Sequence, residues 1–209
     1  MTESVLNVQV TENDIVNTNA ETDLLSYSVP ANTLGTTGVL RINIICDYLN
    51  TDASTSTVTL KVKYGATTLY DDATIAFPAL TTTRYPIVIS LTLFAKNATN
   101  SQGCGGNILI GTTGGATTGI GSAGTDEINA LTPLVGANAS EDSTAAKTFV
   151  VTVTHSVAGL TTSFRRLYSV IESVDLTVSV PVPTAIRGRA FGGIGTFHGS
   201  KSEYPIFNT

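Results

Sequence analysis

Charged side chains are scarce in this sequence. Asp, Glu, Lys and Arg together make up 13% of its 209 residues, against about 25% in an average soluble domain. The hydroxyl groups of Thr and Ser, amides and the backbone must therefore form much of the surface. Such a surface costs less free energy to remove from water than a charged one, so it suits lasting contact with neighbouring subunits.

Dense basic clusters and long apolar runs are missing as well. The net charge is −5 and the cations are scattered along the sequence, which argues against nucleic-acid binding through a basic field. The longest apolar stretch, 87–95, is interrupted by Ser90 and Thr92 and is far shorter than the ~20 residues of a membrane-spanning helix. Residues 1–4 do not resemble the start of a signal peptide. We therefore expect a soluble protein made in a cytoplasm, with no nucleic-acid and no membrane partner.

Cysteine, histidine and tryptophan are also few, at two, two and none. Two cysteines do not make a disulfide framework, and Cys46 falls on an apolar strand face, which predicts a buried free thiol. His155 and His198 lie in segments unrelated to Cys46 and Cys104, so no set of these residues has metal-ligand spacing. We expect no metal and no cofactor.

Motifs of nucleotide binding and catalysis are weak in this sequence. Gly119–Gly124 fits the pattern G-x-G-x-x-G, but the following residues include Pro133 and Gly136 and form no long amphipathic helix. We interpret this segment as a glycine-rich loop. No Ser lies in a G-x-S-x-G pattern. A catalytic triad can form from residues far apart in sequence and stays open, but we expect no enzymatic activity and no catalytic residues.

Apolar and polar residues alternate along most of the chain. Between Leu40 and Tyr48, for example, the even-numbered residues are apolar or Cys, and Arg41, Asn43 and Asp47 lie between them. Because successive side chains of a strand point to opposite faces, this pattern predicts strands with one face on a core. No stretch of ten residues shows the spacing of an amphipathic helix. The alternation predicts nine strands, at about residues 4–10, 24–29, 39–49, 56–64, 67–77, 85–95, 105–112, 148–156 and 165–180.

These strands predict an all-β fold, an antiparallel β-sandwich. A parallel sheet would need crossover helices, and the number of strands fits a jelly roll. Tyr64–Thr67 is expected to form a tight hairpin, and Pro30–Gly35 a fixed turn, because proline restricts its own φ and glycine tolerates a positive φ. We expect one jelly-roll-like domain, residues 1–184. It contains a long Gly-, Thr- and Ala-rich loop at 112–147, of the kind that usually has a functional or interface role.

Two acidic positions interrupt the expected strand faces. Glu172 interrupts an apolar face between Val170 and Val174. We expect it to pair with an arginine, although a bulge or contact with another subunit is also open. Asp71 and Asp72 could take part in a calcium site, but we interpret them as a solvated strand edge.

The C-terminal residues 185–209 are predicted to form an extended arm. Their many glycines disfavour both helix and strand, while aromatic side chains in a free tail would expose apolar surface. Arginine and aromatic residues are enriched at interface hot spots, so we expect the arm to dock on another protein of the same assembly. The alternative is that it completes its own sandwich as an edge strand. The expected assembly residues are Arg187, Arg189, Phe191, Phe197, Tyr204 and Phe207.

Part of the chain resembles structural proteins of tailed-bacteriophage particles. Residues 27–42, which read YSVPANTLGTTGVLRI, are similar to a recurring run P-A-N-T-L-G-x-x-G-x-L-R-I that precedes a core strand in those proteins. Residues 60–72, LKVKYGATTLYDD, resemble a hairpin of the form L-x-V-K-x-G-x-T-x-L. The likeness covers about residues 24–75. It implies a jelly-roll-like virion domain, commonly trimeric, with no catalytic residues shared in the family.

The resemblance and the low charge together predict a non-enzymatic virion structural protein. We expect a homo-oligomer, a trimer, that serves as a capsid decoration or head-fibre component, assembled in the host bacterial cytoplasm. Its partners would be other copies of itself and other virion proteins such as the major capsid protein. The alternative is a tail-associated receptor- or carbohydrate-binding module. Sugar sites usually stack rings on exposed aromatics, and the absence of Trp weakens that alternative. A glycan-cleaving enzyme would need two facing carboxylates, which the sequence does not reveal.

Overall fold

The computed structural model describes residues 2–77, 79, 81, 83–111, 132–135, 137–158 and 162–175. The chain divides into two units, Met1–Val178 and Ser179–Thr209. The second unit, and with it the predicted arm, lies outside the described residues. The sandwich described below belongs to the first unit.

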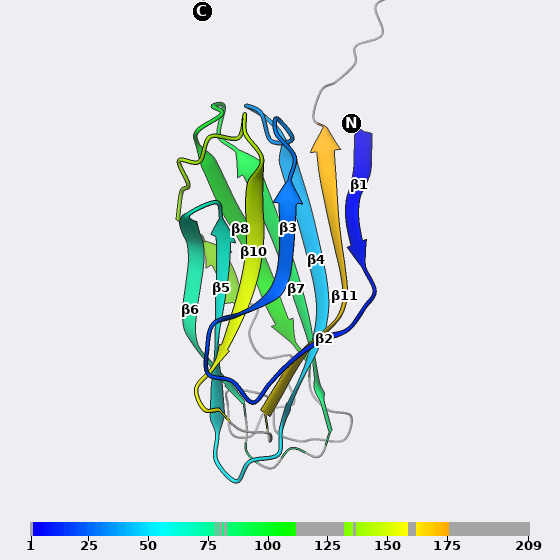
Figure 1. Ribbon diagram of the computed structural model, residues 1–209, viewed down its shortest axis with the longest axis vertical. Helices are drawn as coiled ribbons and strands as arrows, with labels where there is room; N and C mark the ends of the chain where they lie inside the picture. The colour runs from blue at the N-terminus through cyan, green and yellow to red at the C-terminus, as the bar shows by residue number, and fades with distance from the viewer. Residues whose placement is uncertain are drawn as a thin grey trace, which may run out of the picture. The chain divides into compact units, whose positions relative to one another are not determined.

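Every regular element in the described part of the chain is a β-strand, and the strands form two antiparallel sheets (Figure 1). This confirms the predicted all-β sandwich. The strands are β1 (Thr2–Gln9), β2 (Asn13–Val16), β3 (Thr22–Val29), β4 (Val39–Asn50), β5 (Ser56–Tyr64), β6 (Thr67–Phe77), β7 (Tyr85–Ala95), β8 (Gln102–Ile110), β9 (Thr132–Val135), β10 (Lys147–His155) and β11 (Thr162–Asp175).

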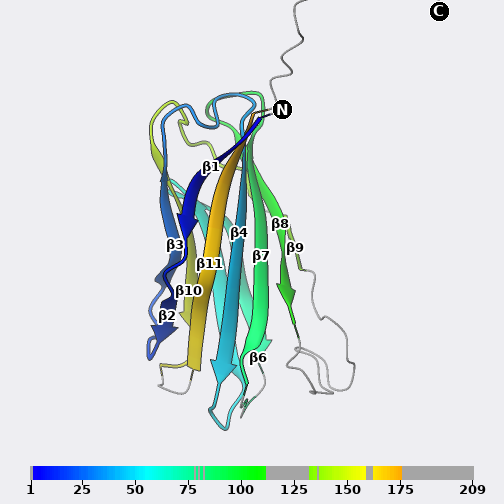
Figure 2. The same cartoon turned by 90° about the vertical axis from the view of Figure 1, so that its right-hand side faces the viewer.

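The pairing of the strands is nested along the chain. The larger sheet has the order β1-β11-β4-β7-β8-β9, with β2 also pairing with β11, and the smaller sheet has the order β3-β10-β5-β6. Among the strands that the structure describes, the first thus pairs with the last, β3 with β10, β4 with β7 and β5 with β6. Figure 2 shows the larger sheet with β1, β11, β4, β7 and β8 side by side. Each sheet contains strands from both halves of the sequence, so neither sheet can form from a local segment alone.

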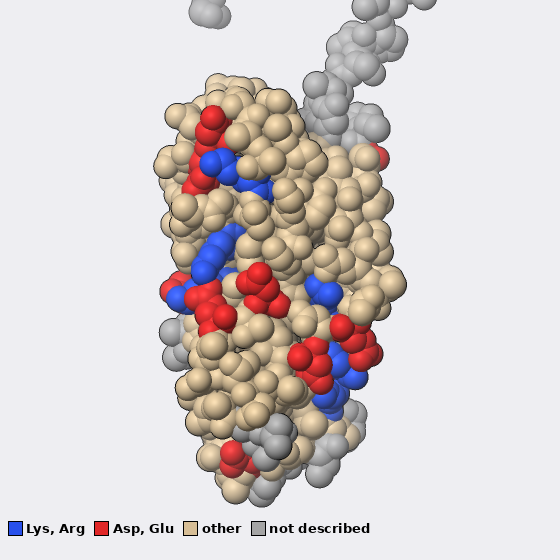
Figure 3. Space-filling view, in the orientation of Figure 1, with Lys and Arg blue, Asp and Glu red and all other residues tan. Residues whose placement is uncertain are grey.

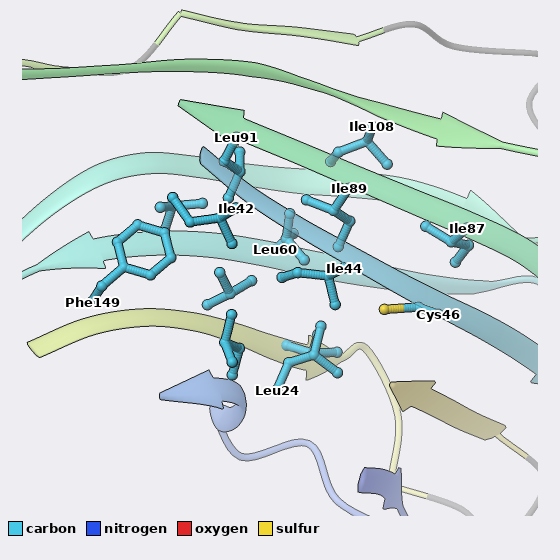
Figure 4. Close-up of a cluster of buried hydrophobic side chains, with 14 of the residues drawn as sticks. Leu24, Ile42, Ile44, Cys46, Leu60, Ile87, Ile89, Leu91, Ile108 and Phe149 are labelled. Atoms are coloured by element: carbon cyan, nitrogen blue, oxygen red, sulfur yellow. The ribbon is translucent and has the colours of Figure 1, made fainter. Parts of the chain in front are cut away.

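The core lies between the two sheets and follows the predicted alternation. Ile42 and Ile44 of β4 and Ile89 of β7 point inward from the larger sheet, and Leu60 of β5 and Phe149 of β10 from the smaller one, each at most 1% exposed. Figure 4 shows these side chains meeting between the sheets. Full burial of one such side chain stabilises the folded state by about 1.5–3 kcal/mol. A single apolar core therefore holds the two sheets together.

The expected loop at 112–147 is only partly a loop. Residues 112–131 and 136 lie outside the described residues, but β9 pairs with β8 and Ala139 forms a bridge with Gln102. The buried side-chain amide of Gln102 donates hydrogen bonds to the carbonyl oxygens of Thr99 and Glu141, at 2.9 and 2.8 Å. The part of this segment near Glu141 is therefore held in place by contacts within its own domain and does not need a neighbouring subunit to order it.

The predicted core face of the last described strand was wrong for residues 168–172, although Val174, expected on that face, is buried. The pairing of β11 with β4 shifts register between Arg166 and Tyr168, so Phe164 and Arg166 face the core and so do Ser169 and Ile171, all buried. Tyr168, Val170 and Glu172 consequently lie on the outer face. A bulge of this kind exchanges the inward and outward directions of the side chains that follow it.

Glu172 therefore does not interrupt the core. It lies opposite Arg41 in the register of β11 with β4, but the ion pair that Arg41 forms is with Glu3, at 2.6 Å. Asp71 matches its prediction, since it is exposed on β6 and pairs with Lys61.

Candidate assembly surface

The outer face of the larger sheet carries uncharged side chains across its middle. The register of β1, β11, β4, β7 and β8 aligns these side chains in two adjacent rows. One row contains Val8, Val170, Asn43, Ser90 and Asn107, and the next contains Tyr168, Ile45, Val88 and Leu109. We call these nine residues the central outer face.

Apolar groups on this face are open to solvent. Ile45 is 43% exposed, Val8 is 48% exposed, and Val5 beside them on β1 is 58% exposed. Phe94, at the far end of β7, is 36% exposed. Contiguous exposed apolar surface rimmed by polar groups is typical of protein–protein contact sites.

Charged groups lie at the two ends of the same face. Arg41 and Glu3 pair at one end, with both side chains about half exposed. At the other end the side chain of Asp47 is only 10% exposed and accepts hydrogen bonds from Arg84 at 2.7 Å and from Arg165 at 2.6 Å. These bonds to Asp47 raise the pKa of Arg165 above its ordinary value. The arginines at each end thus form their ion pairs within the chain, and Glu172, opposite Arg41 on the outer face, adds a further carboxylate at the first end.

Glu12 and Asp14 also belong to the charged group around Asp47. Glu12 lies 3.3 Å from Arg165, and Asp14 lies 3.9 Å from Arg84. Asp14 is on β2, which pairs with the beginning of β11. The cluster therefore ties the N-terminal segment to the middle strands of the larger sheet.

The outer face of the smaller sheet is different. Lys61 and Lys63 of β5 project from it and form ion pairs with Glu21 and, for Lys61, with Asp71 at 3.2 Å. Thr152 of β10 donates a hydrogen bond to Glu21 at 2.9 Å. The hydrogen bond from Lys63 is the main cause that lowers the pKa of Glu21. Lys and Arg side chains and carboxylates gather over the middle of this side of the molecule (Figure 3).

The turn between β3 and β4 is built from the residues of the first virion-like run. Leu34 is 1% exposed, and Asn32 and Gly35 both have a positive φ, which confirms the predicted turn. A Cβ at Gly38 would lie 2.5 Å from the carbonyl oxygen of Leu34, so the position accepts only glycine. The backbone N–H of Gly38 donates to that oxygen at 2.6 Å.

A groove of about 430 Å³ runs beside this turn. Residues 32–38 form one side, and Leu6 of β1 with Ser173 and Val174 of β11 form the other. None of the described residues that line it is charged. The turn, the first strand and the end of the last strand therefore meet at one end of the larger sheet.

The hairpin between β5 and β6, which belongs to the second virion-like run, is held by Glu141. The carboxylate of Glu141 accepts hydrogen bonds from the Ala66 backbone N–H at 2.9 Å and from the Thr67 hydroxyl at 3.0 Å. It also pairs with Lys147 at 2.9 Å. These contacts, chiefly the one from Lys147, lower the pKa of Glu141.

Ser143, two residues further on, holds the β3–β4 turn. Its carbonyl oxygen accepts a hydrogen bond from the Asn32 backbone N–H at 2.8 Å. Its hydroxyl donates to the Thr99 carbonyl oxygen at 2.7 Å and lies 3.2 Å from the Gly35 carbonyl oxygen. The short segment 141–143 thus contacts both of the runs that resemble phage virion proteins.

The buried titratable groups are enclosed in the core. His155 lies at the end of β10 and is only 1% exposed, and its Nε2 is 3.0 Å from the Ile15 carbonyl oxygen. Burial lowers its pKa. The predicted free, buried thiol of Cys46 is confirmed, and burial raises its pKa; burial also raises the pKa of Cys104 to about 12. Neither thiol is ionised at neutral pH.

Several predicted residues are not brought together by the described structure. The assembly residues Arg187, Arg189, Phe191, Phe197, Tyr204 and Phe207 lie outside the described residues, as do His198 and the Gly119–Gly124 run. Within the described ranges, no three or more His, Cys, Asp or Glu residues are grouped so that they could hold a metal ion. The same ranges contain no helix long and apolar enough to cross a membrane.

The central outer face was not predicted from the sequence, although a signal for it exists. Ile44-Ile45 in β4, Ile87-Val88-Ile89 in β7 and Ile108-Leu109-Ile110 in β8 place apolar residues next to each other. In a strand with one wet face such neighbours should alternate with polar residues, so these runs indicate strands that are apolar on both faces.

No family model matches the chain, and no curated protein matches it significantly.

Proposed function

We propose that this protein is a non-enzymatic structural component of a tailed-bacteriophage particle, and that it assembles as a homotrimer. The observation that carries the proposal is the convergence of the two virion-like runs on residues 141–143. Glu141 binds the hairpin of one run and Ser143 binds the turn of the other. The two runs on which the proposed likeness rests are therefore joined through one short segment of the sandwich.

The order of the strands supports a finer description of the fold as a jelly roll. A jelly roll consists of two Greek keys wound into two sheets, and its strands pair in a nested way, the first with the last. The pairs β1–β11, β3–β10, β4–β7 and β5–β6 follow that order. In this description β8 and β9 extend the larger sheet beyond β7.

The place that we propose in the particle is a capsid decoration or a head fibre. A surface poor in charge suits permanent contact with other copies and with the major capsid protein. Residues 185–209, with Arg187, Arg189 and four aromatics, would serve as a docking arm on such a neighbour. The protein would be made in the cytoplasm of the host bacterium and packed into the virion there.

Quantitative mass spectrometry of purified particles tests this proposal. The chain should be present at a constant ratio to the major capsid protein. Hundreds of copies per particle would place it as a decoration, and a few to a few dozen would place it at a vertex, fibre or tail. A position in the tail would favour the receptor-binding alternative. Particles that form normally and contain none of the chain would contradict the proposal.

A further inference from the structure

We propose that copies of this chain contact one another through the central outer face of the larger sheet, with Val5 and Val8 of β1 at its margin. The inference rests on the proposed homo-oligomer and names one surface of each copy that takes part in its contacts. Ile45, Val8 and Val5 are between 43% and 58% exposed. Tyr168 and Val88 beside Ile45 in the same row are partly exposed as well.

The whole outer face of the larger sheet has the size of a subunit contact. Five neighbouring strands spaced about 4.8 Å apart span about 24 Å, and ten residues rising about 3.3 Å each span about 33 Å. This outer face, with the central outer face in its middle and the charged groups at its ends, thus covers about 800 Å², which is close to the area that each partner buries in a standard interface. One face of this size is enough for a stable contact between two copies.

The charges on the face favour a second copy as the occupant. Arg41 with Glu3 at one end, and Asp47 with its two arginines at the other, form ion pairs within the chain. A partner therefore does not need to bring a field of the opposite sign. Each chain carries a net charge of −5, so two copies repel each other over their other surfaces, and contact is least unfavourable where charge is absent.

The smaller sheet provides the internal comparison. Lys61, Lys63, Glu21 and Asp71 occupy its outer face, and burying them against another copy would remove all four from water. That cost can exceed the attraction between the charges. The two outer faces therefore differ: a copy can cover the middle of the larger sheet without desolvating charged groups, whereas covering the middle of the smaller sheet would desolvate its ion pairs.

A pair of matched lysine substitutions tests the face. Ile45→Lys places a cation in the middle of the proposed contact, and Val157→Lys places one at a site outside it. The two side chains have nearly the same exposure, 43% and 44%, so both changes should be tolerated equally by the isolated fold. Mass measured by light scattering, together with the melting temperature, reports assembly and folding separately.

The expected result is a difference in mass between the two variants. Ile45→Lys should weaken self-association by at least about 30-fold, the change expected at an interface hot spot, while Val157→Lys should keep the mass of the unchanged protein. Asn43→Lys provides a second variant, because it replaces a polar, partly exposed side chain and removes no apolar packing. It should lower the mass in the same way while the melting temperature stays high.

Two other outcomes would overturn the inference in different ways. If the unchanged protein oligomerises and both Ile45→Lys and Asn43→Lys keep its mass, the face is wrong and the proposed oligomer stands. If the unchanged protein is a monomer of 21.7 kDa at micromolar concentration, both the face and the proposed homotrimer are wrong.

Discussion

The two outer faces of the sandwich place their charges in opposite ways. On the larger sheet the ionic groups lie at the ends, around Arg41 and Asp47, and the middle is uncharged. On the smaller sheet Lys61 and Lys63 occupy the middle and pair with Glu21. Because a charge in the middle of a face must be desolvated before the face can be covered, the smaller sheet is the one that suits permanent exposure to water. Both faces share one core, so they can be tested separately only by changes that leave the core intact.

The largest effect is expected where a substitution breaks the core beneath both faces. Ile89→Asp buries an unpaired carboxylate between the sheets and should cost more than about 4 kcal/mol of unfolding free energy. Ser90→Asp, one residue further on, points to the outer face and should cost less than about 1 kcal/mol. Urea denaturation measures both. Equal losses would show that the assignment of inner and outer sides of β7 is wrong.

The next effect concerns the charged end of the larger sheet. Asp47→Asn removes a carboxylate that is 10% exposed and leaves Arg84 and Arg165 without their main acceptor. The loss should be about 2 kcal/mol, as for hydrogen bonds to charged groups that are largely out of water. The melting curve of the variant should therefore shift clearly. A variant that melts like the parent would show that the cluster does not stabilise the fold.

A pH effect is expected from His155, which joins β10 of the smaller sheet to Ile15 of β2. Burial lowers its pKa in the folded protein from an ordinary value of 6.5. Above pH 6.5 the imidazole is neutral in both states. As the pH falls below 6.5, the unfolded chain binds a proton that the folded chain excludes, so the unfolding free energy falls, by at most about 1.4 kcal/mol per pH unit.

Denaturation at pH 7.5, 6.5 and 5.5 checks this slope. His155→Gln should flatten the slope between pH 6.5 and 5.5. His198→Gln, which removes the other histidine of the chain, should leave the slope as it is. If His198→Gln flattens the slope and His155→Gln does not, the titrating group has been assigned to the wrong histidine.

The smallest effect is expected on the outer face of the smaller sheet. Glu21→Gln removes the acceptor of Lys61 and Lys63, but these side chains are about a third exposed, and solvent-exposed ion pairs contribute only about 0–1 kcal/mol. Since the pKa of Glu21 is lowered, its contribution is present above pH 4.5 and disappears as the pH falls through the folded-state pKa. A loss as large as that of Asp47→Asn would remove the distinction between the two faces.

Much of the fold followed from the alternation of the sequence. Nine strands were expected and each has its counterpart, because burying one face of a strand leaves a period-two pattern that is easy to read. The two strands that were missed, Asn13–Val16 and Thr132–Val135, have four residues each. That length is too short for a period to show, and the second contains Pro133, which disfavours a strand assignment.

The face of β11 and the candidate site were harder to predict. The register shift after Arg166 depends on how β11 pairs with β4, and nothing in the sequence of β11 alone marks it. Val170 was therefore expected on a core face, whereas it lies on the outer face together with Tyr168. An apolar residue that faces a core and one that faces a partner give the same sequence pattern, so the pattern could not distinguish core positions from contact positions.

The pairing of the first strand with the last determines when the sandwich can be completed during synthesis. Thr2 of β1 lies opposite Asp175 of β11, so the N-terminal strand leaves the ribosome long before its partner exists. Translation at about 5–20 residues per second leaves β1 without its partner for about ten seconds or more. During that interval the strand that carries Val5 and Val8 can pair incorrectly with another strand. A chaperone that binds this segment during synthesis should therefore raise the yield of folded protein more than one that acts after release from the ribosome.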